Sequence, residues 1–479
     1  MGQTINIKLK GFLGMQQGKS DPMTPANCAV DCCNVETRGG VLKRMKGFTA
    51  LCAPVSDTAN IKRAYIWSRR GLNDLRISCS ETDLYCYNSL QNAWISFYTI
   101  SEQGLDMDSV SLLRVKIGDD DYLLIANGQG AILKWDGVIV NAPTPFGSAE
   151  LGSSAPVSMM AMHYGRLFSA GSGVSPCRLY WSCAPGGTRT IENWGASDDG
   201  ADVSGGYVEV GIDSDPITGL FALSNQLVIF KRNRLYRLIG DRPSNYRIVT
   251  VPASFPDVNR SLCVTYADRL FFLTELGLYY YDGQNVYRTQ NGAALADMLK
   301  SADFSCATAA AVNDRLCFAF RKSSASTAND VVIEYDVLRD CFLTRSGFKA
   351  TSLFEHRGRL YIVTDGDALA VFDDSNSYCG ARINAYWQTP RFDFETLHTS
   401  KRALLLSLSG RGGLMKADCI ADGDERSAYA RLPDETGTAD VPLTGEGRAI
   451  SIRLSNVNGS DFEITDGPEL CCEQCARPI

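Results

Sequence analysis

Pro216 to Gly240 reads PITGLFALSNQLVIFKRNRLYRLIG, and this stretch decides the fold. It holds two short apolar runs, at residues 227–230 and 235–239, and the polar residues 231–234 separate them. Short apolar runs with a turn-forming tetrapeptide between them are typical of a half-buried β-hairpin and not of a helix. The stretch therefore predicts two antiparallel strands joined by a tight turn.

The same pattern recurs along the chain. Between about residues 62 and 376 we identify seven passages of similar make, each with three or four short strand-like runs separated by turn residues. Repeats of roughly 40 to 50 residues built from four strands are typical of propeller blades. The sequence predicts an all-β fold with a seven-bladed β-propeller, to within one blade, because one such sheet cannot bury its faces alone. Five passages place a turn before a strand that begins with leucine: Gly165-Arg166-Leu167, Asn225-Gln226-Leu227, Asp268-Arg269-Leu270, Asp314-Arg315-Leu316 and Gly358-Arg359-Leu360.

Other segments flank or interrupt the repeat. Residues 1–60 lack it, and we expect an N-terminal lead-in segment that joins a propeller spanning residues 61–378. Residues 186–215 carry many glycines and acids and little apolar surface. We expect them to be a long insertion between the third and fourth blades, held in place by a neighbouring subunit or protein. Residues 379–479 alternate strand-like runs with glycine turns, which predicts a C-terminal antiparallel β-sandwich behind a linker at residues 375–377.

Composition limits the class of protein. Of the 479 residues, 45% are hydrophobic and 21% are charged, which is typical of a folded, turn-rich chain. We find no apolar run of about 18 residues that could cross a membrane, and the start of the chain lacks the apolar region of a signal peptide. We therefore expect assembly in a cytosol and no membrane span.

The 17 cysteines form only two clusters. The first is Cys28, Cys32 and Cys33, and the second is Cys471, Cys472 and Cys475. A zinc site needs four ligands at chelating spacing, so one Cys-x-x-Cys pair is a weak signal. We expect most of the cysteines to be small, reduced and buried side chains.

The search for catalytic, cofactor or metal-binding residues yields no candidate site. The three histidines, His163, His356 and His398, are not paired at helical spacing and do not lie in a nucleophile motif. Three acidic clusters could hold calcium through oxygen ligands, but their spacing departs from the EF-hand loop, and we expect solvated turns there. The clusters are Asp119-Asp120-Asp121, Asp198-Asp199 with Asp202, and Asn456, Asn458 and Gly459 with Asp461 and Glu463.

The signatures of other propellers are incomplete. Trp135-Asp136 lacks the Gly-His partner of a WD40 blade, and a kelch-like pattern occurs once, at residues 85–94. A kelch-like or lectin-like binding module remains an alternative; it would hold its ligand in a central depression lined by Trp67, Trp181 and Tyr281. A glycan-cleaving enzyme is a second alternative, and it would need two carboxylates converging at that depression.

Four stretches of the sequence resemble one family of proteins. They are NVETRGGVLKRMKGF (34–48), LYWSCAPGGTRTIENW (179–194), the organising stretch 216–240, and AYWQTPRFDFETLHTSKRALLLSLSG (385–410). Together they resemble the β-propeller tail proteins of tailed bacteriophages, the tail nozzle, tail hub or packaged-DNA stabilisation proteins of short-tailed phages.

The resemblance implies a non-catalytic structural protein of the virion tail, assembled in the host bacterial cytoplasm. It implies a homo-oligomeric ring, six-fold in symmetry, that contacts neighbouring tail or portal-adaptor proteins; whether it lies proximally or distally in the tail stays open. Double-stranded DNA would pass along the axis of the ring without specific binding. The formal net charge of −7 fits that expectation, because tight DNA binding comes chiefly from Lys and Arg neutralising phosphates.

Overall fold

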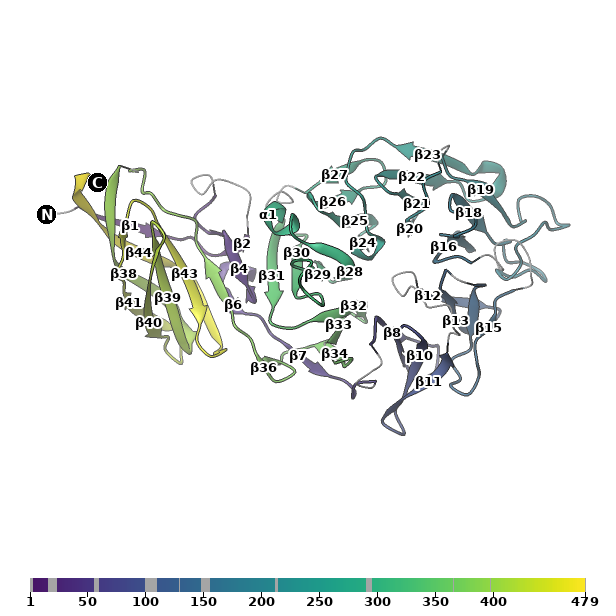
Figure 1. Ribbon diagram of the computed structural model, residues 1–479, viewed down its shortest axis with the longest axis horizontal. Helices are drawn as coiled ribbons and strands as arrows, with labels where there is room; N and C mark the ends of the chain where they lie inside the picture. The colour runs from purple at the N-terminus through teal and green to yellow at the C-terminus, as the bar shows by residue number, and fades with distance from the viewer. Residues whose placement is uncertain are drawn as a thin grey trace.

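The computed structural model describes residues 3–15, 24–55, 60–99, 110–128, 130–147, 156–211, 214–289, 295–364, 366–396 and 398–478. These residues form an all-β fold of many small sheets, consistent with a β-propeller and a β-sandwich. Figure 1 shows a small lobe that holds both chain termini and a large lobe whose sheets follow one another around a common centre. Within the described residues, no helix is long and apolar enough to cross a membrane.

The described part of the large lobe contains seven sheets, each built on an antiparallel run of strands in chain order. The first three sheets are β8 (Arg63–Trp67), β9 (Leu75–Cys79), β10 (Asp83–Asn88) and β11 (Ala93–Thr99); β12 (Ser111–Ile117), β13 (Asp120–Ala126), β14 (Leu133–Trp135) and β15 (Thr144–Pro145); and β16 (Met159–His163), β17 (Arg166–Ala170), β18 (Arg178–Trp181) and β19 (Gly206–Glu209). The fourth and fifth are β20 (Gly219–Leu223), β21 (Gln226–Lys231), β22 (Arg234–Ile239) and β23 (Arg247–Val251), then β24 (Cys263–Tyr266), β25 (Arg269–Thr274), β26 (Gly277–Tyr281) and β27 (Val286–Arg288).

The sixth and seventh sheets have six strands each because other parts of the chain add to them. The sixth is β28 (Asp303–Val312), β29 (Arg315–Arg321), β30 (Val331–Asp336) and β31 (Cys341–Ser346), extended by β2 (Leu13–Met15) and β3 (Cys28–Ala29). The seventh is β32 (Ala350–His356), β33 (Arg359–Thr364) and β34 (Leu369–Phe372), extended by β7 (Phe48–Ala50), β35 (Ser377–Tyr378) and β36 (Ala381–Arg382). Two short helices connect consecutive sheets, η5 (Arg260–Leu262) and α1 (Ala296–Leu299), and η4 (Pro243–Asn245) lies between β22 and β23 within the fourth sheet.

Each predicted passage coincides with one of these sheets. The two apolar runs of the organising stretch are β21 and β22, which pair antiparallel from Gln226↔Ile239 to Lys231↔Arg234. The recurring turn-plus-leucine pattern marks the start of the second strand in the third to seventh sheets. Its physical basis is a turn that contains residues of positive φ, such as Gly165 and Asp268, followed by a leucine that is buried in the core.

Neighbouring sheets bury their faces against each other. Six apolar clusters join the first sheet to the second and so on to the seventh, and a further cluster joins the seventh to the first through side chains such as Val363 and Ala64. Several consecutive first strands also contact each other; for example, β28 packs on β32 and β32 packs on β8. Each sheet is therefore covered on both faces, which is why every residue of strands such as β17 and β21 is buried.

Two further sheets form the small lobe. One contains β41 (Gly437–Pro442), β38 (Thr399–Gly412), β44 (Phe462–Pro478), β6 (Leu42–Arg44) and β5 (Val35–Glu36), with β1 (Gln3–Lys8) paired to β44 and β42 (Glu446–Gly447) paired to β38. The other is β4 (Asp31–Cys33), β37 (Tyr386–Gln388), β43 (Ile450–Asn456), β39 (Leu414–Ala421) and β40 (Asp424–Arg431). Their core is continuous with that of the fifth and sixth sheets.

The described part of the lead-in pairs with both lobes. Four of its strands, β1, β4, β5 and β6, pair within the small lobe, β2 and β3 extend the sixth sheet, and β7 pairs with β34 of the seventh. η2 (Arg38–Gly40) connects β5 to β6. The chain thus passes back and forth between the lobes before the first sheet begins, as the purple strands in Figure 1 show.

The expected position of residues 186–215 in the fold is wrong. The described part of the insertion lies within the third sheet, between β18 and β19, instead of between the third and fourth sheets. It is also ordered by its own chain. Trp194 and Ile191 are buried in the cluster that joins the second and third sheets, and the buried Arg166 donates to the carbonyls of Ser182 (2.7 Å) and Ser204 (2.9 Å). Contacts within the chain therefore hold the described part of the insertion, and the expected contact with a neighbouring subunit or protein stays a prediction.

A specific protease site inserted after the exposed Gly380 tests the lead-in pairing. We expect the two cleaved fragments to elute together on native size-exclusion chromatography and to separate only in denaturant. The reason is that β1, β4 and β6 lie in the first fragment while their partners β44 and β37 lie in the second. Fragments that separate without denaturant would contradict this account and restore two independent folding units.

Candidate functional site

A cavity lies at the centre of the large lobe. It has a volume of about 310 Å³, and the first strand of each of the seven sheets contributes to its wall. Most of the lining is apolar, with side chains such as Leu112, Met159 and Phe221. Its size is at the lower end of the range for small-molecule pockets, about 300 to 1,000 Å³.

Two arginines reach across one end of this cavity. Arg63, the first residue of β8, donates to the carbonyl of Val110 (3.0 Å) ahead of β12 and to the hydroxyl of Ser261 (3.2 Å) ahead of β24. Arg260, next to that serine, donates to the carbonyl of Ser158 (3.1 Å) ahead of β16. The two guanidiniums therefore tie together the starts of four first strands.

The predicted aromatic lining does not gather at the cavity. Trp67, Trp181 and Tyr281 are buried in three different clusters between sheets, where Trp67 contacts Trp135 (5.9 Å between ring centroids) and the Tyr281 hydroxyl donates to the Gln226 side chain (2.8 Å). Their apolar area is used to pack one sheet on the next. The described residues that line the cavity include no Asp or Glu.

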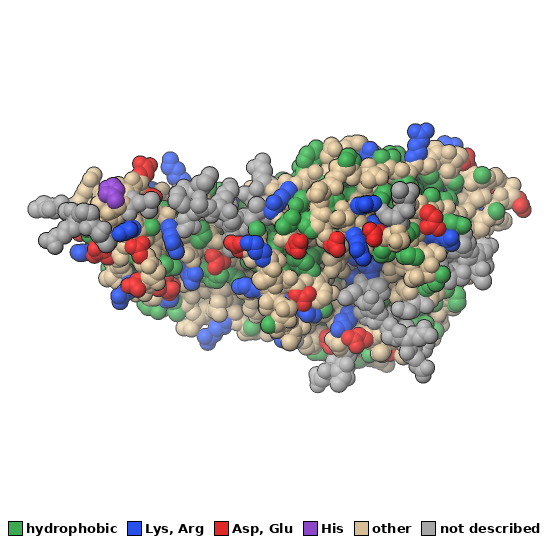
Figure 2. Space-filling model, turned by 45° about the horizontal axis from the view of Figure 1, so that its top comes forward, with side chains coloured by type: hydrophobic (Ala, Val, Ile, Leu, Met, Phe, Trp, Pro, Cys, Tyr) green, Lys and Arg blue, Asp and Glu red, His purple; other side chains and the backbone are tan. Residues whose placement is uncertain are grey.

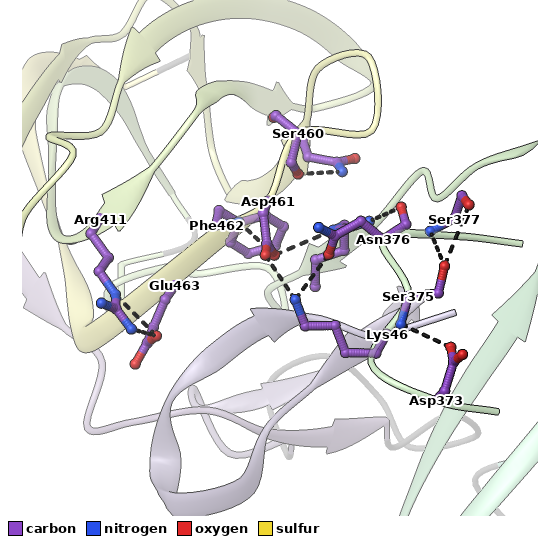
Figure 3. Close-up of polar contacts among 12 residues, drawn as sticks. Lys46, Asp373, Ser375, Asn376, Ser377, Arg411, Ser460, Asp461, Phe462 and Glu463 are labelled. Atoms are coloured by element: carbon purple, nitrogen blue, oxygen red, sulfur yellow. Dashed lines mark hydrogen bonds and ion pairs between the residues drawn. The ribbon is translucent and has the colours of Figure 1, made fainter. Parts of the chain in front are cut away.

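A second polar site lies where the lead-in crosses the linker between the lobes (Figure 3). The Gly47 amide donates to the carbonyl of Ser375 (2.7 Å), and a Cβ at position 47 would lie 1.9 Å from the carbonyl oxygen of Ser377. Only glycine fits this close approach. Asn376 accepts from Lys46 (3.0 Å) and from Arg44 (2.7 Å). The linker is thus held by the lead-in along its length.

Asp461 of the small lobe completes this crossing. Its carboxylate pairs with Lys46 (3.0 Å) and with the buried Arg44 (3.3 Å). Burial alone raises the pKa of Asp461, but hydrogen bonds from these two cations outweigh burial and hold the pKa below its ordinary value. Glu463 pairs likewise with Lys43 (3.1 Å) and Arg411 (2.9 Å).

Asn34 connects the two lobes through every polar group it has. Its side-chain amide donates to the carbonyls of Ser346 (3.0 Å) and Asn384 (2.7 Å). Its side-chain oxygen accepts from the Ser346 amide (3.1 Å) and the Tyr378 hydroxyl (2.8 Å). Its backbone bonds to Thr344 and Met45, both at 2.8 Å, and its φ of 55° is one that asparagine tolerates.

A buried ionic cluster lies beside Asn34. Glu334 of β30 pairs with Arg315 (2.6 Å) and with Arg345, and Arg315 also pairs with Glu36 of the small lobe. Arg345 in turn donates to the carbonyl of Lys46 (2.8 Å). Burial alone raises the pKa of Glu334, but the guanidiniums of Arg345 and Arg315 outweigh it and keep the pKa below its ordinary value.

The histidines lie apart from one another. His163 is buried on β16 against Tyr164 and Phe168, and burial lowers its pKa; its Nε2 has no hydrogen-bond partner among the described residues. His356 contacts Asp74 (3.1 Å), which joins the seventh sheet to the first. His398 is exposed.

The acidic clusters face cations of the protein. Asp119 pairs with Lys116 (3.4 Å) and Asp121 with Arg114 (3.3 Å), while Asp199 pairs with Arg189 and Asp202 accepts from the Ser244 amide (3.1 Å). Within the residues that the structure describes, no group of three or more His, Cys, Asp or Glu is placed to hold a metal ion.

The 17 cysteines are free thiols in this structure, and most are buried. Cys28, Cys32, Cys33 and Cys472 are buried, while Cys471 and Cys475 are half-buried. Burial raises the pKa of Cys472 to about 12. A thiol with so high a pKa is a poor nucleophile at neutral pH.

Sequence reasoning missed the residues that organise both sites. Arg63 and Arg260 lie in ordinary strand and loop contexts, and Glu334 is one acid in an apolar strand. In the sequence, residues 34–48 stand out only through the resemblance described above. The one feature of residues 34–48 that points to the polar site is a run of basic residues beside Gly47, in a chain of net negative charge.

No protein-family model matches the chain, and no curated protein matches it. Among solved structures, it is similar to the extracellular domain of a putative hybrid two-component system from B. thetaiotaomicron, at 13% identity and a TM-score of 0.41 over 68% of this chain and 39% of that one. It is also similar to PorZ, a surface component of the type-IX secretion system of Porphyromonas gingivalis, at 11% identity and a TM-score of 0.39 over 80% of this chain and 46% of that one. The chain spans less than half the length of these proteins.

Replacing Glu334 with Gln tests the ionic cluster. The variant keeps the shape of the side chain but leaves two buried guanidiniums without their shared carboxylate, so we expect the free energy of unfolding at pH 7 to fall by about 3–5 kcal/mol. Glu275→Gln, at an exposed position, is the matched control and should stay within about 0.5 kcal/mol of the wild type. Denaturant titration measures both.

The same comparison has a defined pH dependence. A carboxyl whose pKa is lowered by folding contributes stability above its unfolded pKa of about 4.3, and this stability is lost as the pH falls through the folded value. The stability gap between the wild type and Glu334→Gln should therefore narrow in acid. If the two proteins have the same free energy of unfolding at pH 7, or if the difference between them does not change with pH, the ionic cluster does not stabilise the contact between the lobes.

Proposed function

We propose that the chain is a structural subunit of a bacteriophage virion: one copy in a ring of the tail, of nozzle or hub type, that forms the conduit for genome retention and ejection. In this proposal the seven sheets of the large lobe are the blades of a closed seven-bladed β-propeller, and the small lobe is the β-sandwich that follows it. The protein is not an enzyme, and it resides in the virion tail after assembly in the host cytoplasm.

Three observations support a closed ring of blades. One cavity is lined by the first strands of all seven sheets. Strand β7, which precedes the first sheet, completes the seventh by pairing with β34. His356 and Arg357, at the turn between β32 and β33, both contact Asp74 of the first sheet.

The observation that carries the function is the locked joint between the lobes. A conduit subunit must bind a neighbour on one flank and a different partner on the other, which is a heterologous contact that closes by rotation. Force on one lobe reaches the other only if the joint is stiff. Asn34, the Glu334 cluster and the Gly47 crossing supply that stiffness, and two of them lie in the phrase that resembles phage tail proteins.

Surface charge fits a channel through which DNA slides. Basic and acidic side chains are interspersed over the face of both lobes drawn in Figure 2, and the chain carries a formal net charge of −7. Without a broad basic surface there is little counterion release to hold a phosphate backbone. A mildly negative wall lets DNA pass without binding it.

The alternatives have weaker support. A binding module is favoured by one observation, the central cavity, which is small and whose described lining does not include the expected Trp67, Trp181 and Tyr281. A glycan-cleaving enzyme needs two carboxylates about 5 to 10 Å apart, and the described lining of the cavity provides neither.

A conditional knockout in the phage that encodes the chain tests the proposal. Particles made without the protein should package DNA into heads but carry a truncated tail, leak the genome or fail to deliver it, as seen by electron microscopy and an ejection assay. A plasmid copy of the wild type should restore infectivity, and so should Glu275→Gln. Complete and infectious particles without the protein would overturn the proposal.

A further inference from the structure

Four basic residues line a pocket at the start of β44. The pocket has a volume of about 330 Å³, and its described lining includes Lys43, Arg44, Lys46 and Arg411. The side chains of Lys43, Lys46 and Arg411 are 42–55% exposed, whereas Arg44 is buried. Three basic head groups are thus open to a ligand from solution.

Strand register places two of these cations on either side of one carboxylate. Glu463 of β44 lies opposite Lys43 of β6 on one side and opposite Arg411 of β38 on the other. Lys43 binds its Oε1 (3.1 Å) and Arg411 binds its Oε2 (2.9 Å). The two positive groups are therefore neighbours, with a single carboxylate between them.

Asp461 holds a second pair of cations beside the first. Arg44 binds its Oδ1 (3.3 Å) and Lys46 binds its Oδ2 (3.0 Å). The hydrogen bond to Glu463 raises the pKa of Arg411 above its ordinary value, and the negative charge of Asp461 adds to this effect. Both carboxylates thus act on one guanidinium, and the two pairs form one cluster (Figure 3).

The cluster carries an excess of positive charge. In the part of the chain that the structure describes, its four cations form ion pairs with these two carboxylates and with no other acid. Asp434, the third acid of the lining, is 91% exposed and pairs with Arg431 (3.9 Å), which lies outside the lining. Four positive charges therefore face two negative ones, and a ligand with two negative charges balances them.

The cluster also has hydrogen-bond donors for such a ligand. Arg411 donates to Glu463 through Nε (3.3 Å) and Nη2 (2.9 Å), so its Nη1 has no partner among the described residues. Within the same residues, the Lys43 ammonium has one acceptor and the Lys46 ammonium has two, of the three that an ammonium group can serve. Guanidinium and ammonium groups are the side chains that proteins use to bind phosphate.

We propose that this pocket binds one small phosphate dianion, either inorganic phosphate or the head group of a phosphate monoester. The phosphate lies between Arg411, Lys43 and Lys46 and leaves both carboxylates in place. It links the lead-in, which supplies the two lysines, to β38, which supplies the arginine. The proposal is independent of the tail function, because binding is measured on the isolated chain and its failure leaves the conduit untouched.

Calorimetric titration of the purified full-length chain at low ionic strength tests the site. Inorganic phosphate and glycerol phosphate are the two probes, and their affinities show which source of the group the pocket prefers. We expect one molecule to bind per chain, and binding should weaken as potassium chloride is added, because salt screens the charges. Duplex DNA at the same phosphate concentration should bind more weakly, since each backbone phosphate carries one negative charge.

Arg411→Gln is the principal variant, and Arg402→Gln is its matched control. Both arginines lie in β38 with side chains 55% exposed, but Arg402 pairs with Glu446 and Glu473, outside the pocket lining. The first variant should weaken phosphate binding at least about tenfold, and the second should leave it unchanged. Glu463→Gln should strengthen binding at least about threefold, because it removes a charge that repels phosphate. Damage to the fold would not strengthen binding.

Acylation of lysines supplies a test that needs no variant. Bound phosphate should slow the reaction of an N-hydroxysuccinimide ester with Lys43 and Lys46. It should not slow the reaction with Lys116, which is 50% exposed and pairs with Asp119 outside the pocket lining. Mass spectrometry of the digested protein measures each lysine separately.

Three results would overturn the proposal. One is the absence of saturable binding of either probe by about 10 mM, a level at which a Kd of about 1 mM would be evident. Another is equal binding to the wild type and Arg411→Gln, or acylation of both lysines that neither probe slows. The third is duplex DNA that protects these lysines better than either probe, which would make the cluster a contact for a nucleic-acid backbone.

Discussion

Asn34 is the residue on which the two-lobed structure depends. A primary amide offers two donors and an oxygen with two lone pairs, and all four are used here, together with the backbone N–H and C=O. The partners belong to β31 of the large lobe, to the linker and to the start of the small lobe. A buried amide left half-satisfied is costly, so any rotation of one lobe against the other breaks hydrogen bonds that water does not replace.

The rest of the joint follows from that position of the lead-in. Because β4 and β5 pair inside the small lobe, Glu36 is placed against Arg315, and because residues 42 and 43 of β6 pair with β44, Arg44 and Lys46 reach Asp461 and Asn376. The chain then continues over Gly47 to complete the seventh sheet. Strand β6 of the small lobe ends at Arg44, and β7, which pairs with β34 in the seventh sheet of the large lobe, begins at Phe48. Each lobe therefore depends on the other.

The parts of the fold that repeat periodically along the chain can be predicted from the sequence. Seven repeats, the hairpin at residues 226–239 and the buried leucine after each turn are local signals, and the strands lie where the pattern predicts. The lead-in strands could not be predicted in this way, because β4, β5 and β6 are two or three residues long, and β4 and β6 pair with residues more than 300 positions away. Composition does not reveal that Trp194 and Ile191 of the glycine-rich insertion are buried between the second and third sheets, so these contacts could not be predicted.

The candidate sites illustrate the same limit. Tryptophans and tyrosines at strand positions suggest a ligand surface, yet these side chains pack between the sheets. Burial there stabilises the fold most for large apolar side chains. The cavity is instead lined by side chains that the sequence gives no reason to group. Arg63 and Arg260 are about 200 positions apart and meet only because the first strands surround one centre.

Hydrogen exchange at equilibrium tests most directly whether the two lobes form one cooperative unit. If they do, the slowest amides of β43 in the small lobe and of β31 in the large lobe open with the same free energy, equal to that of global unfolding, and both lose protection together in Asn34→Ala. If β43 opens with a clearly lower free energy than β31, and Asn34→Ala changes neither, the lobes are independent domains on a tether and the central claim fails.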